Sequence, residues 1–155
     1  MTDGLERVRC HIAERGVDPN IVVFNDGTES SELAAKALGC SVAEIAKSVV
    51  FTAEQTYVVV VSGDMRVSTA RLSSVLGLKV KLANRESVKS LTGYDAGGVP
   101  PFPHNEGVRT LVDKSLRRFE NVWTAGGKTN AVFRIPVRTL IDIAGNHEVD
   151  VSEQR

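Results

Sequence analysis

The sequence predicts an α+β fold, with a mixed, partly barrel-like β-sheet and surrounding helices in a single domain. Helix-like and strand-like segments alternate irregularly along the chain, and several neighbouring strands are joined by short turns typical of hairpins. A doubly wound parallel sheet would instead need regular alternation of strands and helices. The 155 residues suit one domain, and no internal repeat or linker interrupts them, so we treat residues 1–155 as one unit.

The first elements are a helix, a short strand and a second helix. Apolar residues recur at helical spacing over residues 4–15. Ile21–Phe24 reads as a short buried strand, because turn residues follow it directly. Ser31 is the predicted N-cap of a helix from Glu32 to Leu38, with Gly39 at its end.

A β-hairpin is predicted next, and a shorter run of alternating elements follows it. The hairpin strands are Lys47–Ala53 and Thr56–Ser62, preceded by a helical turn at Val42–Ala46. Further along the chain, capping residues and apolar spacing predict a helix beginning at Ser68 or Thr69 and ending at Leu76, a strand at Lys79–Leu82, and a helix at Arg85–Leu91.

Residues 92–105 differ in composition from the rest of the chain. This segment contains three glycines and three prolines, so it can be neither a regular helix nor a central strand. Its adjacent glycines, Gly97 and Gly98, allow backbone amides to approach a ligand, and the prolines that follow stiffen the loop. A stiff connecting turn explains the composition equally well.

The remaining elements are a strand, a capped turn, a hairpin and a last helix. Val108–Val112 is the predicted strand, and Asp113 lies where a helix N-cap is needed. The hairpin joins Val122–Ala125 to Asn130–Ile135, after which Pro136 begins a helix that ends near Ala144. The acidic C-terminal tail is expected to fray.

One lysine lies in an unusual position within the predicted hairpin. Alternation along the strand puts Lys47 on the same face as Val49 and Phe51. If that face is buried, the ammonium must meet an anion such as a phosphate or a carboxylate, because an unpaired buried charge is costly. The alternative, which the pattern alone favours, is a strand-edge lysine whose ammonium reaches solvent.

Composition excludes several classes of protein. The 19 basic residues balance the 19 acidic ones, which argues against nucleic-acid binding through bulk positive charge. The balance is uneven along the chain, because residues 66–138 hold 13 basic and 5 acidic side chains. If they share a face with the site, these basic residues can guide an RNA end: Lys79, Lys81, Arg85, Lys89, Arg109, Lys114, Arg117 and Arg118.

No cofactor, metal ion or membrane span is expected. The two cysteines lack the spacing of a metal site, and the three histidines are scattered. The N-terminal segment lacks the apolar region of a signal peptide, and the longest apolar runs are strand-sized. We therefore expect a cytoplasmic protein, and the sequence leaves its oligomeric state open.

Five sequence blocks carry a family resemblance. They occur in this order: Ala46–Phe51, Val61–Val67, Thr92–Tyr94 with Gly97–Phe102, Leu111–Leu116, and Ala125–Gly127 with Asn130–Arg134. Each block is common by itself, but together they resemble the YbaK/prolyl-tRNA synthetase-associated domain family, over about Ile21 to Ala144. The resemblance implies a trans-editing hydrolase that deacylates mischarged aminoacyl-tRNA, with the tRNA 3′ end as partner and a synthetase as a possible second partner.

The same resemblance implies roles for individual residues. Lys47 helps to position the 3′-terminal adenosine and its phosphate, and the loop ending at Gly97 and Pro101 holds the aminoacyl group. The nucleophile is then water assisted by a terminal ribose hydroxyl. The expected catalytic residues are Lys47, Gly97, Gly98 and Pro101, and the expected substrate-binding residues are Val99, Pro100, Tyr94, Asp113, Gly126 and Asn130.

Several alternatives remain at this stage. Asp113 is better explained as a helix cap, Tyr94 as a core aromatic, and Gly126 and Asn130 as parts of a hairpin turn. Pro100 and Pro103 depart from residues common in the family, which leaves the preferred amino acid open. The competing functions are a non-catalytic module that binds a tRNA end, a nucleotide or a synthetase, and a hydrolase of small acyl esters.

Overall fold

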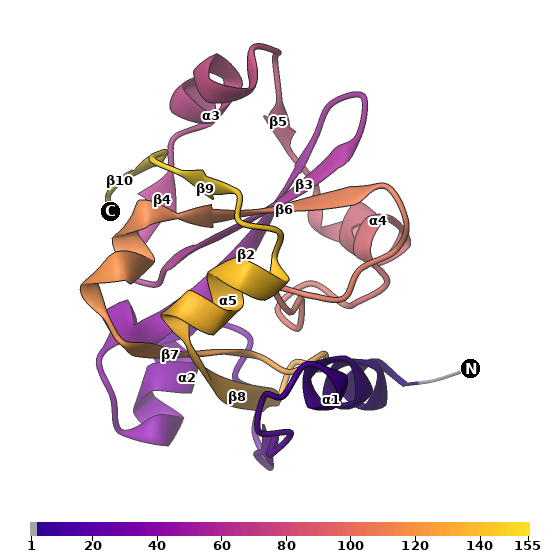
Figure 1. Cartoon of the computed structure of the whole chain (residues 1–155), viewed down its shortest axis with the longest axis vertical. Helices are drawn as coiled ribbons and strands as arrows, with labels where there is room; N and C mark the ends of the chain where they lie inside the picture. The colour runs from indigo at the N-terminus through magenta and orange to yellow at the C-terminus, as the bar shows by residue number, and fades with distance from the viewer. Residues whose placement is uncertain (1–2) are drawn as a thin grey trace.

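A mixed β-sheet with helices on both faces forms the centre of the structure (Figure 1), a computed structural model that describes residues 3–155. Met1 and Thr2, the start of the segment expected to lack a signal peptide, lie outside the described residues. Within residues 3–155 the main sheet has eight strands: β1 (Val22–Val23), β2 (Ile45–Thr52), β3 (Thr56–Ser62), β5 (Lys81–Leu82), β6 (Val108–Asp113), β7 (Asn121–Ala125), β8 (Ala131–Pro136) and β9 (Glu148–Val149).

The strand order confirms the predicted α+β class. Along the sheet the order is β1-β8-β7-β2-β3-β6-β9, with β5 also pairing with β2. The pairs β2–β7, β3–β6 and β6–β9 are parallel, and the other pairs are antiparallel. The sheet stays open, since β1 and β9 lie at its two ends. A separate ladder joins β4 (Met65–Val67) to β10 (Ser152–Gln154).

Helices cover both faces of this sheet, which explains why its central strand is apolar throughout. The helices are α1 (Gly4–Glu14), α2 (Ser31–Leu38), α3 (Thr69–Leu76), α4 (Val88–Thr92) and α5 (Val137–Ile143), with 3-10 turns η1 (Val42–Glu44), η2 (Arg85–Ser87) and η3 (Lys114–Arg118). In β3, Val58 and Val60 pack with α1, α4 and α5, whereas Val59 packs with α3. Helix α2 covers Ile45 and Trp123.

The helix ends follow the expected chemistry with one shift. Ser30 caps α2 by accepting a hydrogen bond from Leu33 N–H, so the predicted cap at Ser31 is wrong by one residue. Gly39 ends α2 in the left-handed conformation, at φ 70°. Ser68 caps α3, and Pro136 precedes α5 as its N-cap.

Two strand predictions were wrong. Strand β2 begins at Ile45 rather than at Lys47, because Ile45 and Ala46 already pair with β7. The acidic tail does not fray: Val151 is fully buried, and β9 and β10 are both paired. Its charge concealed the alternation of Val149 and Val151, both of which pack in the cluster around α3.

Asp113 connects this tail to the rest of the fold. Its carboxylate accepts hydrogen bonds from Ser115 N–H and from Val151 N–H, both at 2.9 Å. The first bond confirms Asp113 as the N-cap of η3. The second bond holds the tail, and the Asp113 side chain itself is 1% exposed.

We expect Asp113→Ala to lower the free energy of unfolding by about 2–4 kcal/mol, because a buried backbone N–H group loses its acceptor. Urea unfolding followed by circular dichroism measures the change. Asp142→Ala, on exposed α5 surface, is the control and should change stability by less than about 0.5 kcal/mol. Equal stability of the wild type and the Asp113 variant would contradict the tethering role.

Candidate functional site

A break in the β-ladder creates a cavity beside β2. Strand β2 pairs with β7 only through Ile45 and Ala46, and with β5 only through Phe51 and Thr52. Between these contacts, Lys47–Val49 have no strand partner on the side away from β3, within the part of the chain that the structure describes. Two loops approach this gap, and the space left between them and the sheet is a cavity of about 70 Å³.

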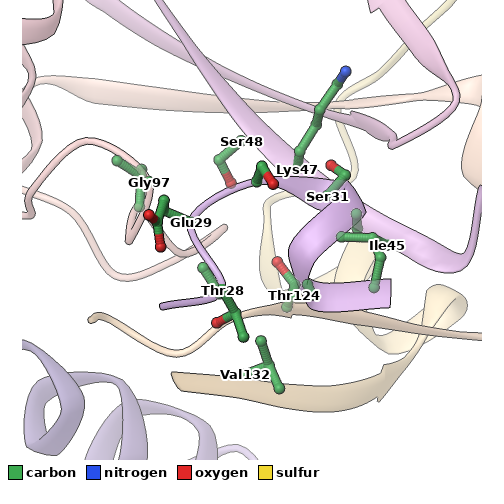
Figure 2. Close-up of a pocket in the computed structure, with 14 residues that line it drawn as sticks. Thr28, Glu29, Ser31, Ile45, Lys47, Ser48, Gly97, Thr124 and Val132 are labelled. Carbon is green, nitrogen blue, oxygen red and sulfur yellow. The ribbon is translucent and has the colours of Figure 1, made fainter. Parts of the chain in front are cut away.

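The cavity is small and mixed in character (Figure 2). Apolar side chains, including Ile45, Val99 and Val132, form part of its wall. Hydroxyl groups of Ser48 and Thr124 and the carboxylate of Glu29 supply its polar part. A water molecule occupies about 30 Å³ of liquid volume, so the space suits a group of only a few heavy atoms.

The loop before α2 is held against the β7–β8 turn. Thr28 N–H donates to Thr129 O at 2.6 Å, and the Asn130 side chain donates to Phe24 O at 2.8 Å. These bonds fix the position of Glu29, which lines the cavity. Asn130 therefore acts on the site through the loop, and it does not line the cavity itself.

Glycines are required where the second loop meets its neighbours. Gly97 has φ +89°, and a Cβ there would lie 2.5 Å from Cβ of Glu29. A Cβ at Gly98 would lie 2.8 Å from the carbonyl carbon of Lys128. The neighbours that require these glycines are therefore Glu29 and Lys128 of this chain, whereas the sequence prediction concerned the approach of a ligand.

The amides of this loop differ in availability. Gly98 N–H donates to Asp95 O at 2.9 Å, so it is not free to bind a ligand, contrary to the expectation for both glycines. The N–H groups of Gly97 and Val99 take part in no hydrogen bond formed within residues 3–155. These two amides remain available to a carbonyl oxygen or an oxyanion.

Buried side chains fix the rest of the loop from behind. His104 Nε2 lies 2.7 Å from Pro100 O, and Thr110 Oγ1 donates to Pro101 O at 3.1 Å. Tyr94 is 2% exposed, and its hydroxyl donates to Pro103 O at 2.6 Å. Burial raises the pKa of Tyr94 to about 12. Pro100, Pro101 and Tyr94 thus shape the loop without lining the cavity.

Lys47 lies at the edge of the cavity with a free ammonium. Its side chain is half-buried and points away from Thr124 and Val132 (Figure 2). Burial lowers the pKa of Lys47, and so does the nearby Arg155, whereas Glu32 and Asp64 act in the opposite direction. Glu32 pairs with Arg155 and Asp64 pairs with Arg118, while Lys47 forms no ion pair with any residue from 3 to 155. Such an ammonium is ready to bind an anion.

The expected site residues fall into two groups. Lys47, Gly97 and Val99 line the cavity. The other expected residues do not line it: Gly98, Pro100, Pro101, Tyr94, Asp113, Gly126 and Asn130. A Cβ at Gly126 would lie 2.8 Å from Cγ2 of Ile21, so that glycine packs against the start of β1.

Sequence reasoning missed the polar side chains of the cavity. Ser48 and Thr124 occupy core-facing positions of β2 and β7, where apolar residues are usual. A polar residue at a core-facing position of a strand is unusual, and this feature of the sequence could have identified Ser48 and Thr124. Glu29 gave no such signal, since only the folding of its loop brings it next to Gly97.

The basic residues of the central segment are partly neutralised. Arg117 pairs with Glu148 and Arg118 pairs with Asp64 at 2.8 and 2.7 Å, and Lys89 pairs with Asp95 at 3.5 Å. None of the eight basic residues that the sequence analysis named lines the cavity.

Among the described residues, no helix is long and apolar enough to cross a membrane.

Comparison with known proteins gives consistent matches. Residues 25–143 match the family described as the aminoacyl-tRNA editing domain. YwhH, an uncharacterized protein of Bacillus subtilis (strain 168), is 28% identical over 142 residues, which cover 90% of each chain. The proline–tRNA ligase of Lactobacillus helveticus (strain DPC 4571) is 28% identical over 113 residues, which cover 72% of this chain but only 20% of the ligase.

A solved structure also matches nearly the whole chain. It is described as a candidate trans-editing enzyme for prolyl tRNA synthetase. The two chains are 32% identical with a TM-score of 0.89, and the match covers 99% of each. The overall fold is therefore shared with that protein.

The partly buried His104 makes stability depend on pH in a predictable direction. Burial lowers the pKa of His104 from 6.5 to about 4. Between these values the unfolded chain binds more protons than the folded one, so the stability present above pH 6.5 is lost as the pH falls towards 4. We expect a loss of about 1–3 kcal/mol from this residue.

Urea unfolding of the wild type and of His104→Gln at several pH values between 7 and 4 measures the contribution. The glutamine side chain can still donate to Pro100 O but does not titrate. The variant should therefore show the shallower pH dependence, since the carboxylates contribute equally to both proteins. Parallel curves for the two proteins would exclude His104 as the source.

Proposed function

Because the chain belongs to the aminoacyl-tRNA editing domain family, as its five sequence blocks predicted, we propose that it hydrolyses the ester of mischarged aminoacyl-tRNA. The products are the free amino acid and the uncharged tRNA. The observation that carries the proposal is the small cavity between Gly97 and Thr124, which is lined by two residues whose amides form no hydrogen bond within residues 3–155 and has a free ammonium at its edge. In this proposal residues 1–155 form one editing domain that acts in the cytoplasm, where charged tRNA is found.

The size of the cavity supports selection of a small aminoacyl group. A space of about 70 Å³ is the size needed for a short side chain. Its walls include Ala34 and Val132, which a larger group would have to displace. A site of this kind discriminates chiefly by excluding what is too large.

Lys47 is assigned to the nucleic-acid part of the substrate. Its ammonium is directed away from the cavity, so it can bind a phosphate near the 3′-terminal adenosine while the aminoacyl group enters. The desolvation that lowers the pKa of Lys47 also strengthens its interaction with an anion. A phosphate contact therefore supplies the counter-charge that this lysine lacks among the described residues.

The free amides of Gly97 and Val99 are assigned to the reacting carbonyl. When water attacks the ester carbon, negative charge develops on the carbonyl oxygen, and backbone N–H groups stabilise it. We assign activation of the water to a hydroxyl of the terminal ribose, as the resemblance to the editing-domain family implies. The leaving ribose oxygen then receives the proton, and catalysis depends on positioning.

The defining experiment incubates the protein with a panel of mischarged tRNAs and follows loss of the ester. Lys47→Ala should lower kcat/KM about 10- to 100-fold, the size expected for a lost bond to a charged phosphate. Lys36→Ala, an exposed lysine on α2, is the control and should retain wild-type activity. Full activity of Lys47→Ala, with the fold intact by circular dichroism, would exclude the assigned role.

The same panel separates the competing functions. Tight binding of charged tRNA without turnover of any member would favour a non-catalytic module. Hydrolysis of a small acyl ester that lacks tRNA would contradict assistance by a ribose hydroxyl. Addition of prolyl-tRNA synthetase to the assay tests whether a synthetase partner changes the rate.

A pair of glycine variants tests the loop geometry. Gly97 and Gly107 have nearly the same φ, +89° and +88°, but only at Gly97 would a Cβ meet a neighbour. Alanine at a positive φ should lower the free energy of unfolding of both variants by a similar amount, about 1–2 kcal/mol. We expect Gly97→Ala to lose at least tenfold in deacylation rate and Gly107→Ala to lose less than twofold, and equal losses would contradict the role of the close approach.

A further inference from the structure

Two hydroxyl groups in the cavity have no hydrogen-bond partner. Ser48 Oγ and Thr124 Oγ1 are the buried side-chain polar atoms left unpartnered within residues 3–155. Thr124 is 1% exposed, and both residues line the same cavity from different strands. In Figure 2 their side chains approach the space beside Glu29 from opposite ends.

Leaving these hydroxyls unpaired is unfavourable for the folded protein. A buried hydroxyl without a protein partner contributes no hydrogen bond to the fold, whereas valine or alanine fills the same volume without a polar atom. Two other hydroxyls of the cavity are used, since Ser30 Oγ caps α2 and Thr28 Oγ1 donates to Thr129 O at 3.3 Å. The unpartnered pair is therefore available to a polar group of a bound substrate.

The charges around the cavity favour binding of a positively charged group of the substrate. Glu29 and Lys47 are the charged residues of the cavity wall in the described chain, and the Lys47 ammonium is directed away from Glu29 (Figure 2). Glu29 is exposed, its carboxylate lies beside Gly27 of its own loop, and it forms no ion pair with any residue from 3 to 155, so it supplies a negative charge at the rim of the cavity. Glu32, in the first turn of α2, is already paired with Arg155.

We propose that Ser48, Thr124 and Glu29 bind the α-ammonium group of the aminoacyl ester, an inference that rests on the function proposed above. An ammonium offers three N–H donors, which the two hydroxyl oxygens and the carboxylate accept. This contact positions the aminoacyl group by its α-nitrogen, which all amino acids have. The walls of the cavity limit the size of the side chain. Thr124 and Ser48 are then substrate-binding residues for the editing reaction.

The test compares two substrates that differ at the α-carbon. One is the panel member that the wild type hydrolyses, beginning with alanyl-tRNA, and the other is the same tRNA carrying the α-hydroxy acid, lactyl-tRNA for alanine. We expect the wild type to prefer the amine-bearing substrate at least tenfold, as for other hydrogen bonds to charged groups. Thr124→Val should lower the rate of hydrolysis of the aminoacyl substrate alone, and so reduce that preference to about twofold or less. Ser48→Ala and Glu29→Gln should each reduce the preference by a smaller amount.

A second measurement does not depend on activity. Because Thr124→Val removes an unpartnered buried hydroxyl and keeps the shape, its melting temperature should rise by about 2–4 °C. Thr56→Val, at the start of β3 and away from the cavity, is the control and should leave the substrate preference unchanged. A purely structural role of Thr124 predicts the reverse, a lower melting temperature with the preference intact, and that result would overturn the inference.

The outcomes also separate this inference from the proposed function. Equal rates of the wild type on the amine and hydroxyl substrates would overturn ammonium binding and leave the editing function standing. Absence of hydrolysis of every mischarged tRNA by the wild type would overturn both.

Discussion

The interrupted pairing of β2 is the constraint on which the rest of the site depends. Strand β2 is continuous from Ile45 to Thr52 on the side of β3, but on its other side β7 leaves after Ala46 and β5 joins only at Phe51. A continuous ladder would have filled this space with backbone. Because it is interrupted, two loops must close the gap, and the volume they leave is where a ligand can meet backbone groups from the sheet and from the loops.

The loops that close the gap are held in place by hydrogen bonds to polar groups beside them. On one side Thr129 and Asn130 fix the segment before α2 through backbone bonds. On the other side His104 and Thr110 hold successive carbonyls of the proline-containing loop. A site that works by positioning needs such support, since a small displacement of the free amides would remove them from the reacting carbonyl.

In this protein the polar groups that stabilise the fold and the polar groups that are available to a ligand are different groups. Hydroxyls and amides that support the loops are paired within the fold, whereas Ser48 Oγ, Thr124 Oγ1 and the amides of Gly97 and Val99 are left unpaired at the cavity. Unpaired groups lower stability and raise the affinity for a complementary ligand. Their concentration at one cavity, next to a lysine without an ion pair, is what distinguishes the site from the core around it.

The sequence by itself determined the class of fold, most helices, the hairpins and the position of the glycine and proline loop, because these depend on local periodicity, capping and backbone restrictions. It made Lys47 and Gly97 candidates for the site, Lys47 only through the family resemblance because the strand pattern alone favoured a lysine that reaches solvent, and both residues line the cavity. It did not determine the pairing of the C-terminal tail, in which a buried Val151 and the distant Asp113 outweigh the local acidic charge. Only the tertiary structure decided which residues surround the cavity, since Glu29, Ser48, Gly97 and Thr124 come from four separate segments and meet only where β7 leaves β2.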